Sequence, residues 1–121
     1  MVLVNGSLVG FIPSSLGSLG SLQILNLGQN RLSGTIPESI GLLTNLTYLY
    51  LNDNQLIGSV PSTIVNLRSL NELSLANNQL SGTLPLLIGS LLNLRKLDLS
   101  KNLLSGTIPT IVANSSKLTT I

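Results

Sequence analysis

The sequence contains neither cysteine nor histidine. These absences exclude disulfide bonds, thiolate nucleophiles, imidazole general bases and nearly every zinc or haem site. We therefore expect no metal and no cofactor. The lack of cysteine does not identify a cellular compartment, because an array of repeats can be stable without disulfides.

Aromatic and charged residues are also scarce. Phe11, Tyr48 and Tyr50 are the only aromatic residues. Charged residues make up 8% of the chain, against roughly 25% in an ordinary soluble domain. The six Lys and Arg residues give a net charge near +2 and form no block. Nucleic acid is therefore not expected as a partner.

Long hydrophobic runs are missing too. The longest apolar stretch, at 84–94, is about half of the roughly 20 residues that a spanning helix needs. The first residues, MVLVNGSLVGFI, have no basic region and no small-residue cleavage site. The sequence predicts neither a signal peptide nor membrane insertion for this chain.

A 24-residue repeat is present along the whole chain. Four residue types recur at this interval: Pro13, Pro37, Pro61, Pro85 and Pro109; Gly10, Gly34, Gly58, Gly82 and Gly106; Asn30, Asn54, Asn78 and Asn102; Leu27, Leu51, Leu75 and Leu99. They define complete units at 22–45, 46–69, 70–93 and 94–117, with partial units at 1–21 and 118–121. We expect one array over 1–121, a fragment that lacks both caps, with end-to-end self-association through its uncapped ends.

The repeat predicts a solenoid. Leu25 and Leu27 are two positions apart, so both point to one face of a strand, and one strand per unit stacks into a parallel sheet. The asparagine column lies where each strand ends, and a buried amide must be hydrogen-bonded, which predicts a structural ladder between coils. Gly34 permits close stacking or a positive φ, and Pro37 precedes a short helical segment.

The frame L-x-x-L-x-L-x-x-N-x-L-x-G-x-I-P-x-x-L/I-G, as in LQILNLGQNRLSGTIPESIG, resembles the plant-type leucine-rich repeat. The resemblance implies an α/β solenoid: a right-handed curved superhelix with a parallel concave sheet and short helical or 3-10 convex segments. It also implies a binding module of a plant receptor-like kinase or receptor-like protein, extracellular or at the cell surface, with a protein or peptide ligand. A secreted inhibitor similar to polygalacturonase-inhibiting proteins is the alternative within this class.

The outward positions of the concave strands differ from coil to coil, so the backbone does not dictate them and they are available for recognition. Tyr48 and Tyr50 lie side by side there, and tyrosine often contributes strongly to binding. We expect the ligand-binding residues to be Tyr48, Tyr50, Asn52, Asp53, Glu72, Ser74, Lys96 and Asp98. A merely solvated sheet is the competing interpretation.

The acidic residues do not form a catalytic pair. Glu72 and Asp98 are one unit apart and two positions out of line, and hydrolysis without histidine, cysteine or metal would need two carboxylates. Arg95 and Lys96 make ordinary charge pairing the better explanation. No P-loop or dinucleotide fingerprint is present. We expect that the chain is not an enzyme.

Serine and threonine flank the glycine column in SGTIP-type segments. Ser33 and Thr35 are two residues apart, so an extended segment points both the same way, and stacking predicts a flat hydroxyl ladder at about 4.8 Å spacing. Such a ladder resembles those of ice-binding solenoids, a second alternative function. Phe11 and Ile57 interrupt it.

Three sequons occur, at Asn5, Asn45 and Asn114. They are short enough to arise by chance in a chain rich in Ser, Thr and Asn. If the protein is secreted, the convex ends of the coils at Asn45 and Asn114 are the expected glycan acceptors.

Overall fold

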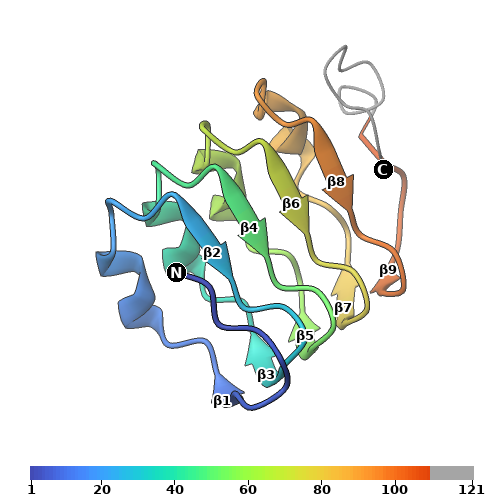
Figure 1. Ribbon diagram of the computed structural model, residues 1–121. Helices are drawn as coiled ribbons and strands as arrows, with labels where there is room; N and C mark the ends of the chain where they lie inside the picture. Colours follow the sequence, from blue (N-terminus) through green and yellow to red (C-terminus); the bar gives the residue numbers. More distant parts are fainter. Residues whose placement is uncertain (110–121) are drawn as a thin grey trace.

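Each of the three units that the structure describes in full, 22–45, 46–69 and 70–93, forms one coil of a solenoid with two short strands and one 3-10 helix (Figure 1). The computed structural model describes residues 1–109. The partial unit 118–121, the last part of unit 94–117 and the sequon at Asn114 lie outside these residues. The coils stack side by side, so that equivalent elements form continuous layers.

Within residues 1–109, the concave sheet has four parallel strands: β2 (Ile24–Asn26), β4 (Tyr48–Tyr50), β6 (Glu72–Ser74) and β8 (Lys96–Asp98). Residues 24 apart pair across it, as in Leu25 with Leu49 and Leu73 with Leu97. This in-register pairing confirms the sheet predicted from the repeat. Each strand turns its middle leucine inward and its two outer residues toward the surface.

The core consists of the leucine and isoleucine columns inside the coils. Leu49, Leu51, Leu56 and Leu73 are fully buried, and Ile40 is almost so. Equivalent side chains from successive coils pack against one another, so each coil covers the apolar interior of its neighbour. Burial of this kind stabilises by about 25 cal/mol per Å² of apolar surface.

The asparagine column connects neighbouring coils through backbone hydrogen bonds. Asn54 Nδ2 donates to the carbonyl oxygens of Leu27, Leu51 and Asn52 at 2.9, 3.2 and 3.2 Å. Its Oδ1 accepts from the Leu32 N–H at 2.9 Å. Asn30, Asn78 and Asn102 repeat this pattern. These amides are therefore committed to the backbone and are not available to a ligand.

In the described part of the chain, four 3-10 helices cover the side opposite the concave sheet: η1 (Ser14–Ser18), η2 (Glu38–Leu42), η3 (Ser62–Asn66) and η4 (Leu86–Ser90). A proline from the predicted column precedes each helix, and before η1, η2 and η3 it is in extended conformation, as Pro37 is with φ −70°. The helices stack closely where Gly41 faces Thr63, because a β-carbon at Gly41 would meet the Thr63 carbonyl oxygen at 2.6 Å.

A second sheet, not predicted as such, runs along the edge of the coils. Among the described residues it contains five parallel strands: β1 (Val9–Phe11), β3 (Arg31–Thr35), β5 (Gln55–Gly58), β7 (Gln79–Gly82) and β9 (Leu103–Leu104). Its glycine column has positive φ, including +73° at Gly34 and +78° at Gly58. The methyl group of Thr35 lies over Gly58 of the next coil, 3.0 Å from the place of a β-carbon.

The predicted flat hydroxyl ladder does not form in this sheet. Residues pair 22 apart, two fewer than the repeat, so Ser33 lies beside Gln55 and Thr35 beside Ile57. The strands are staggered from coil to coil, and equivalent hydroxyls are not direct neighbours. The prediction was wrong because it applied the sequence period to a sheet with a different register.

Candidate functional site

One row of side chains crosses the concave sheet at the first residue of each strand. Backbone pairing places Ile24 beside Tyr48, Tyr48 beside Glu72, and Glu72 beside Lys96. Tyr48 and Glu72 are half-buried, whereas Ile24 and Lys96 are exposed. The row therefore changes from apolar through aromatic and acidic to basic within four strands.

The two tyrosines of β4 form the centre of the site. Their ring centroids are 6.3 Å apart with an interplanar angle of 18°. The Tyr50 hydroxyl donates a 2.7 Å hydrogen bond to Glu72 Oε2 on the neighbouring strand. This contact fixes the orientation of the Tyr50 ring, so the aromatic surface is preorganised, which lowers the entropy cost of binding.

Burial, the hydrogen bond to Glu72 and the negative charges around it raise the pKa of Tyr50 to about 12. The hydroxyl therefore remains a donor at neutral pH. Because the folded pKa lies above the ordinary value of 10.0, this group stabilises the fold fully below pH 10, and the contribution is lost as pH rises from 10 to about 12.

A titration tests this shift. Tyr48→Phe leaves Tyr50 as the sole tyrosine, so ultraviolet absorbance reports it alone. We expect a midpoint near 12, and a lower midpoint when Glu72→Gln is added, because the negative charge is removed. A midpoint near 10 in Tyr48→Phe would contradict the hydrogen-bonded arrangement.

A second group lies where the concave strands end. Asp53 Oδ1 accepts from Asn77 Nδ2 at 2.6 Å, and Oδ2 accepts from Asn52 Nδ2 at 2.7 Å. These two hydrogen bonds, the one from Asn77 first, lower the pKa of Asp53. Asp53 and Asn77 both have positive φ, a conformation that Asp and Asn tolerate better than most residues. Both carboxylate oxygens are thus held within the array.

Two of the predicted residues, Lys96 and Asp98, lie on β8, the last strand of the concave sheet in the described residues. Asp98 Oδ1 accepts from the backbone N–H and the hydroxyl of Ser100, at 3.1 and 2.7 Å. Lys96, on the same strand, is exposed. The Asp98 carboxylate is therefore hydrogen-bonded within its own coil, whereas the Lys96 ammonium is at the surface.

Ser74 is a correction to the predicted site. Its side chain is buried, with 9% exposure, because Tyr50 and Asp98 flank it on the neighbouring strands. Sequence reasoning also left out Ile24, which is 41% exposed beside Tyr48, and Asn77, which binds Asp53. Both lie in the outward columns whose residue type changes from coil to coil, and this variation could have indicated them.

The sequon asparagines in the described region are both exposed. Asn45 Nδ2 donates to the Gly20 carbonyl oxygen at 2.8 Å, and the Thr47 hydroxyl donates to the Gln23 carbonyl oxygen at 2.8 Å. Asn5 has a φ of 83°. Asn45 Nδ2 carries two hydrogens and uses one in this hydrogen bond, and glycosylation stays a prediction.

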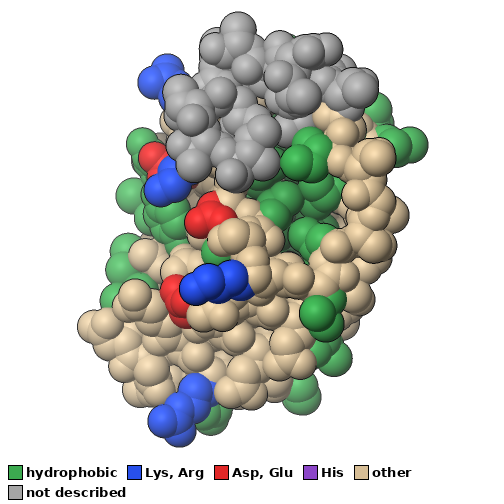
Figure 2. Space-filling view, turned by 90° about the vertical axis from the view of Figure 1, so that its right-hand side faces the viewer, with side chains coloured by type: hydrophobic (Ala, Val, Ile, Leu, Met, Phe, Trp, Pro, Cys, Tyr) green, Lys and Arg blue, Asp and Glu red, His purple; other side chains and the backbone are tan. Residues whose placement is uncertain are grey.

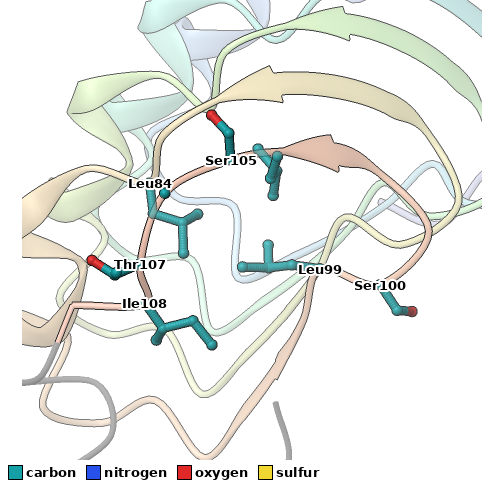
Figure 3. Close-up of a pocket in the computed structure, with 8 residues that line it drawn as sticks. Leu84, Leu99, Ser100, Ser105, Thr107 and Ile108 are labelled. Atoms are coloured by element: carbon teal, nitrogen blue, oxygen red, sulfur yellow. The ribbon is translucent and has the colours of Figure 1, made fainter.

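A hollow of about 310 Å³ opens at the last described coil, and Leu84 and Leu99 point toward it (Figure 3). Ile108 in its wall is 48% exposed, whereas its equivalent Ile36 is only 4% exposed. The hollow is therefore the interior face of a coil and not a separate ligand pocket. Figure 2 shows green apolar side chains in this region, with acidic and basic side chains interspersed on the same side. Self-association through such faces stays a prediction.

Within residues 1–109, the structure contains no cluster of acidic side chains suited to a metal ion. The same residues include no helix with the length and apolar character to cross a membrane.

Comparison with known protein families gives a match over residues 4–120 to the family described as "Leucine-rich repeat region". No curated protein sequence matches the chain. Ectodomains of leucine-rich-repeat receptors, which several similar structures represent, are typically binding modules without enzymatic activity.

Three solved structures illustrate the similarity. The crystal structure of PEPR1–AtPEP1 has a TM-score of 0.96 at 45% identity, covering 100% of this chain and 17% of that one. The Arabidopsis receptor kinase HAESA, in complex with the peptide hormone IDA and the co-receptor SERK1, has a TM-score of 0.67 at 33% identity, covering 98% and 24%. A plant ice-binding protein has a TM-score of 0.89 at 37% identity, covering 95% and 38%. The chain therefore spans less than two fifths of each of these proteins.

Proposed function

The chain belongs to the leucine-rich-repeat family, and from this membership we propose that it is part of the ligand-binding array of a plant receptor-like kinase or receptor-like protein. It recognises a peptide or protein through the concave sheet and performs no catalysis itself. An extracellular or cell-surface location of the parent protein, and the presence of a kinase domain in it, are part of the proposal.

The observation that carries this proposal is the Tyr48–Tyr50 pair in the middle of the concave sheet. The inward columns of the strands hold leucine in every described coil, whereas this outward row holds four different residue types. The Tyr50–Glu72 hydrogen bond orders the pair before a ligand arrives. An ordered, half-buried aromatic pair beside charged groups is the composition expected of a binding hot spot.

The similar structures support a peptide ligand. HAESA is solved with a peptide hormone and a co-receptor, and another similar structure is the peptide hormone receptor RGFR1 with RGF2, at 27% identity. Because this chain corresponds to about a quarter or less of these receptors, we assign it one segment of such an array.

Two alternatives are weaker. An inhibitor similar to polygalacturonase-inhibiting proteins would present the same concave row to an enzyme, and nothing in the row favours it over a peptide receptor. Ice binding is supported by the similarity of this chain to a plant ice-binding protein. The staggered register of the second sheet, however, places Gln55 and Ile57 next to Ser33 and Thr35 instead of a continuous row of hydroxyls.

Selection of random displayed peptides against the chain tests the proposal. We expect selected peptides to bind Tyr48→Ala and Tyr50→Ala about fivefold or more weakly than the unmodified chain, because truncating a hot-spot residue costs about 1 kcal/mol or more. Isothermal titration with the synthetic peptides measures the affinities.

Leu86→Ala is the matched control. Leu86 is 80% exposed on η4 and lies outside the concave sheet, so its truncation removes apolar surface without touching the proposed site. Affinities of the tyrosine variants equal to that of Leu86→Ala, or a selection that enriches no peptide, would overturn the assignment.

A further inference from the structure

Glu72 lies between two strands of the concave sheet, and its side chain forms a hydrogen bond to only one of them. The register places Tyr48 of β4 on one side and Lys96 of β8 on the other. The carboxylate accepts the Tyr50 hydroxyl at 2.7 Å, which directs it toward β4. The acid closest in register to Lys96 is therefore turned away from it.

Asp98 does not neutralise Lys96 either. It is two residues further along β8, on the same face, and its Oδ1 accepts both hydrogen bonds from Ser100. In the part of the chain that the structure describes, the Lys96 side chain forms no hydrogen bond and no salt bridge, and the residue is exposed. An ammonium group without an ion-pair partner thus lies at the end of the aromatic row.

We propose that Lys96 is the anion-binding end of a two-part peptide site, whose apolar end is formed by Ile24 and Tyr48. The ligand is an extended peptide with an acidic side chain for Lys96 and an apolar or aromatic side chain for the other end. This inference rests on the proposed function and adds the chemistry of the ligand. Charge complementarity is its basis: a carboxylate on the ligand supplies the partner that Glu72 and Asp98 do not.

The sheet sets the spacing of the two ligand groups. Neighbouring parallel strands are about 4.8 Å apart, so Lys96 is about 10 Å from Tyr48 and about 14 Å from Ile24 across the sheet. An extended peptide advances about 3.3 Å per residue. The acidic residue of the ligand therefore lies three or four positions from the apolar one.

Affinity selection with a peptide library tests this spacing and the charge. Random peptides displayed without a free C-terminus are selected against the chain, so only side-chain carboxylates are available as anions. We expect enrichment of Asp or Glu three or four positions from an aromatic or aliphatic residue. Replacing that acid by its amide, or replacing Lys96 by glutamate (Lys96→Glu), is expected to weaken binding about tenfold or more.

Arg68→Glu is the matched control, because it makes the same change in net charge at an exposed residue outside the concave sheet. We expect it to change affinity by less than about twofold. A second selection against Lys96→Glu is expected to enrich Lys or Arg in place of the acid.

The outcomes separate this inference from the proposed function. If selected peptides lose affinity with Tyr48→Ala and Tyr50→Ala but not with Lys96→Glu, the two-part site is wrong and the receptor function stands. Enriched peptides without an acid at the stated spacing, or equal losses in Lys96→Glu and Arg68→Glu, overturn it as well. If no peptide is enriched, both fail.

Discussion

Replacing Asn78 by alanine is expected to destabilise the protein by about 3–5 kcal/mol, because each buried group left without a partner costs about 1–3 kcal/mol. Asn78 Nδ2 donates to the carbonyl oxygens of Leu51, Leu75 and Ala76, at 2.9, 3.1 and 3.3 Å. Its Oδ1 accepts from the Leu56 N–H at 3.0 Å. Alanine removes all four hydrogen bonds from a side chain that is only 8% exposed.

Urea unfolding followed by circular dichroism measures this effect. With a slope of about 2 kcal/mol per molar, the midpoint is expected to fall by about 1.5–2.5 M. Asn78→Asp is expected to be at least as severe, since a carboxylate cannot donate to the three carbonyl oxygens. Native-state hydrogen exchange is expected to show the loss of protection at the Leu56 amide.

Asn66→Ala is the control for this prediction, because Asn66 is exposed at the end of η3. We expect it to change stability by no more than about 0.5 kcal/mol. If Asn78→Ala behaved like Asn66→Ala, the asparagine column would not be a structural ladder, and its amides would become candidates for ligand binding.

Gly41→Ala is expected to destabilise the protein by about 2–3 kcal/mol through overpacking between η2 and η3. A β-carbon at Gly41 would lie 2.5 Å from Thr63 Cβ and 2.6 Å from the Thr63 carbonyl oxygen. Since the oxygen belongs to the backbone, relief of the contact requires the two helices to separate. This clash outweighs the 0.4–1 kcal/mol, roughly, that Gly→Ala gains by restricting the unfolded chain.

Gly20→Ala isolates the clash from the unfolded-state effect. Nothing lies within 4 Å of a β-carbon at Gly20, and this glycine does not have a positive φ. We expect Gly20→Ala to be neutral or to stabilise by up to about 1 kcal/mol. Thermal unfolding of both variants compares them, and a Gly41→Ala protein as stable as Gly20→Ala would contradict the close approach of the helices.

The position of Gly41 within the repeat is not glycine in every coil, and the contact between neighbouring helices changes with the residue there. Val65 occupies the equivalent position in η3. The residue that corresponds to Thr63 in the next coil is Leu87, which is 65% exposed, whereas Thr63 is half-buried. The close helix contact between η2 and η3 is thus a property of Gly41, and the repeat frame alone does not guarantee it in every coil.

Sequence periodicity was sufficient for the concave sheet and the core. A strand places alternate residues on opposite faces, so Leu25, Leu49, Leu73 and Leu97 had to point inward together and to stack at the repeat interval. It was not sufficient for the second sheet, where pairing at 22 residues puts Ile57 beside Thr35. The period fixes which residues are equivalent, but not how far a strand slides past its neighbour.

For the candidate site, too, the sequence predicts one part and the tertiary structure decides the other. The variation of the outward columns is enough to predict Tyr48, Tyr50, Glu72 and Lys96 as residues of the concave surface. Which of them bond to each other depended on the direction of each side chain, a choice among rotamers that no sequence pattern contains.

By itself, the sequence determined the coil, the register of the concave sheet and the leucine core, because each follows from a period of two within strands and 24 between them. Only the tertiary structure decided that Ser74 is buried and that Glu72 bonds Tyr50, which leaves Lys96 at the surface. These outcomes depend on packing between neighbouring strands. Their side chains compete for the same space and the same hydrogen-bond partners.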